Sequence, residues 1–308
     1  MRYLAAHAQH IGARRYQQDS LGLADPLNRT FMAHGGFLAV LCDGMGGMEH
    51  GDVASETAVR TFLDAYAHKT PGESIPAALE RSARAANQQV IEAALKLGLK
   101  EGVGTTLVAA ALHSGSLYFI SVGDSAVYHV RGGELIMVNR PHVFANLLDQ
   151  AADRGQISRS EAARHPERES LTSFIGIHDL QEIDRNLEPR PVAAGETVLL
   201  ASDGMFKTLE APEILACLSG HPQSWPQNLV WRTLDRRHPA QDNVTVVSIT
   251  PDSGALGEWA PQPPHTTPMA PPEAVPAAAV PEKRWVLAAV FLLLMAAAFS
   301  GLWYFSAR

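Results

Sequence analysis

Short apolar runs separated by brief turns fill the middle of the chain, between Thr105 and Val138. The runs read TTLVAAAL, SLYFISV, SAVYHV and ELIMV, and the turns between them read HSG, GD and RGG. Turns this short join neighbouring antiparallel strands. We therefore predict an antiparallel meander here, with further strands at Gly36–Cys42, Thr197–Ala201 and Asn243–Thr250.

Helices are predicted where apolar residues recur every three or four positions. This spacing occurs in Val53–His68 and Ile75–Leu97; further helical stretches are predicted at Val143–Arg154 and at Ala211–Arg236, which prolines interrupt. The strands and the helices fall in separate blocks along the chain. Such segregation favours an α+β fold, in which sheet packs on sheet and helices lie outside.

The C-terminal end has a different pattern. Residues 285–307 read WVLAAVFLLLMAAAFSGLWYFSA and contain no charge. Because an α-helix rises about 1.5 Å per residue, about 20 such residues cross a hydrocarbon core. Trp285 at one end, and Trp303 and Tyr304 near the other, suit the membrane interfaces. We predict one C-terminal transmembrane helix, a buried core helix being the alternative.

Residues 252–284 are rich in Pro and Ala, which predicts a semi-rigid linker. Lys283 and Arg284 precede the apolar segment and only Arg308 follows it, so the excess of positive charge places the N-terminal side in the cytoplasm. The predicted organisation is a globular domain at 1–251, the linker, and a single span at 285–307. The predicted location is the cytoplasmic membrane, with the globular domain facing the cytoplasm.

Charge and cysteine content exclude some classes of function. The 308 residues include 25 Lys and Arg against 32 Asp and Glu, a net charge of −7. An acidic chain is a poor clamp for phosphate backbones, so no nucleic-acid partner is expected. The two cysteines, Cys42 and Cys217, are too few for a disulfide framework or a thiolate metal cluster.

Aspartates recur at the ends of apolar runs. Asp43 ends FLAVLCD, Asp203 follows TVLLAS, Asp124 follows YFISVG, and Asp242 precedes the run VTVVSI. Carboxylates that meet at the rim of a sheet repel one another unless a cation lies among them, and Asp is a good ligand for hard cations. Asp-Gly is also a common turn signal. Four occurrences at strand ends favour a metal site over four unrelated turns.

These residues lie in motifs whose order and spacing resemble the bacterial branch of the protein phosphatase 2C (PPM) family. The resemblance covers about residues 1–250. The motifs are RRYQQD at Arg14–Asp19, DGMGG at Asp43–Gly47, GTT at Gly104–Thr106, SVGDS at Ser121–Ser125, HPERESLTSFIG at His165–Gly176, SDG at Ser202–Gly204 and DNVTV at Asp242–Val246.

The resemblance implies a four-layer α-β-β-α sandwich of two antiparallel sheets, with two Mn²⁺ or Mg²⁺ ions in a cleft at one end. Asp43 matches the carboxylate that bridges both ions, and the Gly44 carbonyl matches a ligand of the second. Asp203 and Asp242 match ligands of the first ion.

Three further roles are implied by position in the motifs. Asp124 matches a residue that helps to hold a third ion, and Asp19 matches an acid that orders water around the second ion. Arg14 matches the arginine that binds the substrate phosphate. Gln17 and Gln18 replace the Asn and Glu of the family pattern, which is expected to weaken the second metal site.

The implied activity is the hydrolysis of phosphoserine and phosphothreonine in proteins by a water that bridges the two ions. The expected partners are phosphorylated proteins and a serine/threonine kinase that the enzyme opposes at the membrane. Two alternatives stay open: a membrane-tethered pseudophosphatase that binds phosphoproteins without turnover, and a hydrolase of small phosphoesters.

Overall fold

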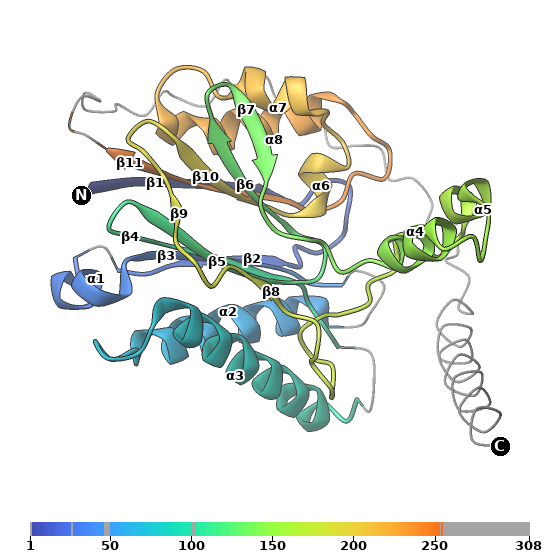
Figure 1. The fold of residues 1–308 in the computed structure, drawn as a ribbon, viewed down its shortest axis with the longest axis horizontal. Helices are drawn as coiled ribbons and strands as arrows, with labels where there is room; N and C mark the ends of the chain where they lie inside the picture. Colours follow the sequence, from blue (N-terminus) through green and yellow to red (C-terminus); the bar gives the residue numbers. More distant parts are fainter. Residues whose placement is uncertain (1, 26, 46–49, 100–102, 253, 255–308) are drawn as a thin grey trace. The chain divides into compact units, whose positions relative to one another are not determined.

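Two antiparallel sheets pack face to face in the computed structural model, which describes residues 2–25, 27–45, 50–99, 103–252 and 254 (Figure 1). Helices cover the outer face of each sheet. The predicted α+β class and the four-layer order are therefore confirmed for the part of the chain that is described.

The first sheet has the strand order β1-β11-β10-β6-β7. Strand β11 is buried along its whole length, and its residues alternate between two cores. Val247 and Ile249 face the second sheet, whereas Val244 and Val246 face the helices outside. This two-residue alternation is the normal consequence of the pleat. The strands are β1 Arg2–His10, β6 Ala126–Arg131, β7 Glu134–Met137, β10 Thr197–Ala201 and β11 Val244–Asp252.

The second sheet has the order β2-β3-β4-β5-β8, and β9 also pairs with β5. Strand β3 alternates in the same way as β11: Leu41 faces the first sheet and Val40 faces the outer helices. The strands are β2 Asp19–Leu23, β3 Phe37–Asp43, β4 Leu107–His113, β5 Ser116–Val122, β8 Asp184–Arg185 and β9 Arg190–Pro191.

Helices α2 and α3 cover the second sheet, with Phe62, Tyr66 and Leu79 fully buried beneath them. Helices α6, α7 and α8 cover the first sheet through residues such as Leu229. The helices are α1 Arg29–Gly35, α2 Gly51–Ala67, α3 Ile75–Lys96, α4 Ala145–Asp153, α5 Arg159–Arg164, α6 Asp203–Phe206, α7 Ala211–Cys217, the 3₁₀ turn η1 Pro222–Ser224 and α8 Trp225–Asp235.

The predicted meander is correct as two hairpins but wrong as one continuous unit. Strands β4 and β5 pair in the second sheet, and β6 and β7 pair in the first. Residues Gly123 to Ser125 carry the chain from one sheet to the other instead of turning β5 back onto β6. Gly123 has a φ of 100°, which favours glycine, and a side chain there would crowd Thr106.

The membrane prediction concerns residues outside the described part. Among the residues that are described, no helix is long and apolar enough to cross a membrane. The predicted span at 285–307, and the linker beyond residue 254, lie outside that part. The span, the linker and the membrane location therefore stay predictions.

Candidate active site

The pairing of β2 with β3 places Asp19 directly across from Asp43. The GTT motif then fixes the end of β3. The Asp43 backbone N–H donates to the Thr106 hydroxyl at 3.0 Å, and the Thr106 N–H donates to the Asp43 carbonyl at 2.8 Å. Gly44 is held in the same way, since its N–H donates to the Gln18 carbonyl at 3.0 Å.

The Asp19 carboxylate ties the two sheets together. Its Oδ2 accepts hydrogen bonds from the hydroxyls of Ser202, at 2.9 Å, and Thr245, at 2.6 Å. Ser202 directly precedes Asp203, and Thr245 lies three residues beyond Asp242, so both predicted ligands are anchored next to Asp19. The other carboxylate oxygen, Oδ1, is buried and has no hydrogen-bond partner in the described part of the chain.

The acids strongly influence one another. Burial raises the pKa of Asp43 well above its usual range, and the charges of Asp19, Asp203, Asp124 and Asp242 raise it further. Burial also raises the pKa of Asp19 to about 6, although its two hydroxyl donors oppose the shift. Buried acids that repel in this way, with an unpartnered oxygen among them, fit a divalent cation chemically.

Basic side chains occupy part of this space. Arg14 donates from Nη2 to Asp242 at 2.6 Å, and Lys207 contacts both Asp124 and Asp203. With these side chains in place, no three His, Cys, Asp or Glu of the described residues are grouped closely enough to enclose an ion. The structure thus brings the predicted site residues into one region, with three of the carboxylates, those of Asp124, Asp203 and Asp242, paired to cations of the protein.

Asn243 is a site residue to which the sequence analysis gave no role. Its amide donates to the carbonyls of Ile11, at 2.8 Å, and Tyr16, at 3.1 Å, and its Oδ1 accepts from the Gln18 N–H at 2.7 Å. Asn243 therefore holds the loop that carries Arg14. The available signal was its place next to Asp242 in the DNVTV motif.

Gly204, in the SDG motif, packs too closely for a side chain. An added Cβ would collide with the backbone carbonyl of Asn243, which cannot rotate away. We expect Gly204→Ala to destabilise the protein by about 1–3 kcal/mol through this overpacking, measured by urea unfolding. Gly72→Ala is the matched control, because its Cβ would meet nothing within 4 Å. Equal stability of both variants would contradict the packing argument.

The raised pKa of Asp19 predicts a pH dependence of stability. An acid whose pKa is higher in the folded than in the unfolded state stabilises the fold when protonated, and this contribution is lost as the pH rises through the folded pKa, here about 6. Between pH 4 and 7, without metal, we expect the unfolding free energy of the wild type to fall by about 2 kcal/mol relative to Asp19→Asn. Urea unfolding in a chelator measures this, and parallel curves for the two proteins would refute it.

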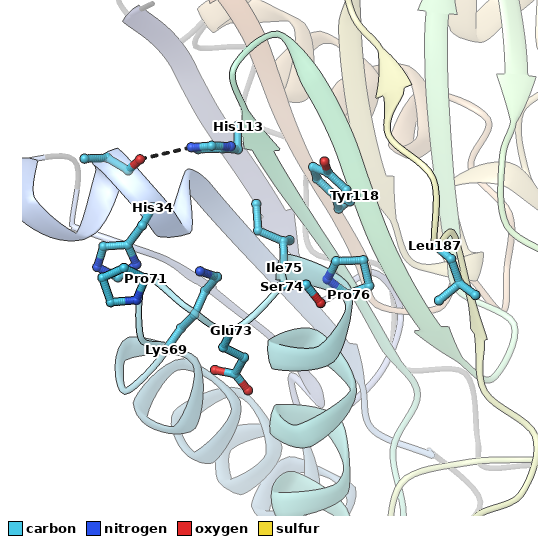
Figure 2. Close-up of a pocket in the computed structure, with 11 residues that line it drawn as sticks. His34, Lys69, Pro71, Glu73, Ser74, Ile75, Pro76, His113, Tyr118 and Leu187 are labelled. Carbon is cyan, nitrogen blue, oxygen red and sulfur yellow. Dashed lines mark hydrogen bonds between the residues drawn. The ribbon is translucent and has the colours of Figure 1, made fainter.

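A separate hollow of about 620 Å³ lies away from these acids (Figure 2). His113, at the opposite end of β4 from Leu107, helps to line it, together with His34, Lys69 and Glu73. None of the aspartates of the site is in its lining. The acid cluster around Asp43 and this hollow are therefore separate features of the fold.

Comparison with known proteins agrees with this geometry. The sequence pattern of the family described as protein phosphatase 2C matches residues 8–243. The serine/threonine phosphatase stp of Listeria welshimeri is 30% identical over 215 residues, which cover 69% of this chain and 83% of that protein.

Solved structures of serine/threonine phosphatases have a similar fold. The serine/threonine phosphatase of S. agalactiae superposes with a TM-score of 0.68 at 27% identity, covering 81% of this chain and 99% of that one. The catalytic domain of the phosphatase PstP in complex with two manganese ions has a TM-score of 0.62 at 26% identity, covering 80% and 97%.

A sandwich of two antiparallel sheets with helices outside is also the fold of the serine/threonine phosphatases that the chain resembles. The chain belongs to the protein phosphatase 2C family. Its relatives are named serine/threonine phosphatases, and it is accordingly a protein serine/threonine phosphatase. Phosphatases of this family use two metal ions.

Proposed function

We propose that this phosphatase hydrolyses phosphoserine and phosphothreonine in proteins with two Mn²⁺ or Mg²⁺ ions held by Asp43, Asp203, Asp242 and the Gly44 carbonyl. The observation that carries the proposal is the convergence of aspartates from both sheets on Asp43, whose pKa they raise. When bound, the two ions lower the pKa of a water and neutralise charge on the phosphoryl group.

The chain's own residues bind and orient the substrate. Arg14 uses Nη2 for Asp242, and its side chain is 43% exposed. The exposed part of its planar guanidinium can bind two phosphoryl oxygens. Asn243 keeps the Arg14 loop in place, and Asp19 links β2 to Thr245 of β11 and to Ser202, which directly follows β10. These contacts pre-position the site before substrate arrives.

The cellular setting is proposed from the sequence. The uncharged segment 285–307 would anchor the enzyme in the cytoplasmic membrane, with residues 1–251 on the cytoplasmic side. Its substrates would then be phosphoproteins at that surface, modified by a serine/threonine kinase that the phosphatase opposes. A reporter active only in the periplasm, fused after Arg308, should be active; an inactive reporter would contradict the single span.

The activity is tested with the full chain stripped of metal. We expect phosphate release from a phosphothreonine peptide only when Mn²⁺ or Mg²⁺ is added, and much weaker release from p-nitrophenyl phosphate. The reverse preference would indicate a hydrolase of small phosphoesters. Peptide binding without release at millimolar Mn²⁺, by a folded chain, would indicate a module that binds phosphoproteins without turnover.

A further inference from the structure

Lys207 lies between two acids of the site. Its Nζ donates to Asp203 at 2.6 Å and to Asp124 at 3.2 Å. Asp203 begins α6 and Lys207 follows one helical turn later, a spacing that puts two side chains on the same face. Asp124 comes from the segment that crosses between the sheets. One ammonium group therefore joins acids from two distant parts of the chain.

Hydrogen bonds of its backbone and of its side chain hold Lys207 in place. Its backbone N–H donates to the Asp203 carbonyl at 2.9 Å, so the stem of the side chain starts from a fixed point. The carboxylates of Asp124 and Asp203 are only 12% and 19% exposed, whereas the Lys207 side chain is 44% exposed. The lysine therefore reaches inward from the surface to neutralise two acids that are largely shielded from water.

A divalent ion at this place would compete with the lysine for the same atoms. Mg²⁺ and Ca²⁺ require several oxygen ligands at about 2.0–2.6 Å. The Oδ2 atoms of Asp124 and Asp203 are the ones that Lys207 already contacts. An ion there would also meet the positive charge of the ammonium. A third ion held by Asp124, which the motif leads one to expect, would have to displace Lys207 from this carboxylate.

We propose that Lys207 is a built-in cation that takes the place of a third divalent ion, so that this phosphatase works with two ions only. Asp124 is then a positioning partner of Lys207 and, through it, of Asp203, instead of a metal ligand. The inference rests on the proposed function, because both concern the same acid cluster. It concerns how many ions the cluster accepts, which can be measured without turnover.

The test is the number of Mn²⁺ ions bound per full-length chain, measured by equilibrium dialysis and elemental analysis at saturating Mn²⁺. We expect two for the wild type and two for Lys207→Arg, which keeps the charge. Lys207→Met should bind three, and Lys207→Met combined with Asp124→Asn should return to two. Circular dichroism establishes that each variant is folded.

The outcomes separate this inference from the proposed function. Three ions in the wild type would overturn the role of Lys207 whatever the variants do, and so would two ions in folded Lys207→Met. In either case metal-dependent phosphate release would still stand. A wild-type chain that binds no Mn²⁺ and releases no phosphate would overturn both.

Discussion

Asp43→Asn is expected to lower phosphate release from a phosphothreonine peptide by about 10³-fold at saturating Mn²⁺. Asn keeps the size of the side chain but removes the negative charge at the point where the other acids converge. The same variant should be more stable than the wild type without metal, since the raised pKa of Asp43 means that its charge costs folding free energy.

A variant that loses activity but gains stability has lost a catalytic group, whereas a variant that loses both has been damaged in its fold. Rates come from phosphate release, and stabilities from urea unfolding in a chelator. Asp153→Asn is the matched control, because Asp153 is 62% exposed and pairs only at the surface, with Arg159. Activity within about tenfold of the wild type for Asp43→Asn would remove Asp43 from the proposed metal site.

Arg14→Ala should reduce kcat/KM for the phosphothreonine peptide by about 10²-fold, because it removes the guanidinium fork proposed to bind the phosphate. Arg14→Lys should recover only part of the loss, since an ammonium lacks the paired donors. Stability should change little, because Arg14 and Asp242 are 43% and 38% exposed and such ion pairs contribute about 0–1 kcal/mol.

Arg15→Ala is the neighbouring control for Arg14, since Arg15 is exposed on the same loop. Steady-state kinetics give kcat/KM for the phosphothreonine peptide in the wild type and the three variants. If Arg15→Ala lost as much activity as Arg14→Ala, general positive charge on the loop, and not a specific phosphate contact, would explain the result.

Four acids of the site, Asp43, Asp124, Asp203 and Asp242, could be found from sequence because each lies next to an apolar run, whereas Asp19 was matched only through the family motif. Runs such as those before Asp43 and Asp203 become buried strands, and strand ends meet at the rim of a sheet. The main helices were predictable for a similar reason, because their apolar spacing is regular over four or more turns.

Other features depend on contacts between distant segments. Strand β1 has the mixed sequence RYLAAHAQH and is set by pairing with β11, which lies more than 200 positions away. Strand β2, with the sequence DSLGL, similarly depends on β3. The contacts of Asn243 with the Arg14 loop and of Lys207 with Asp124 have no local sequence pattern, because the partners are 225 and 83 positions apart in the chain.

The place of β11 in its sheet has a consequence for synthesis of the protein. Strand β11 lies between β1 and β10, and β1 pairs with β11. Strand β1 therefore cannot join that sheet until residues 244–252 have been synthesised. Asp242 and the Thr245 partner of Asp19 arrive with the same segment. A nascent chain that has not reached this point therefore cannot assemble the acid cluster, and the enzyme stays inactive on the ribosome until nearly its whole globular part has been made.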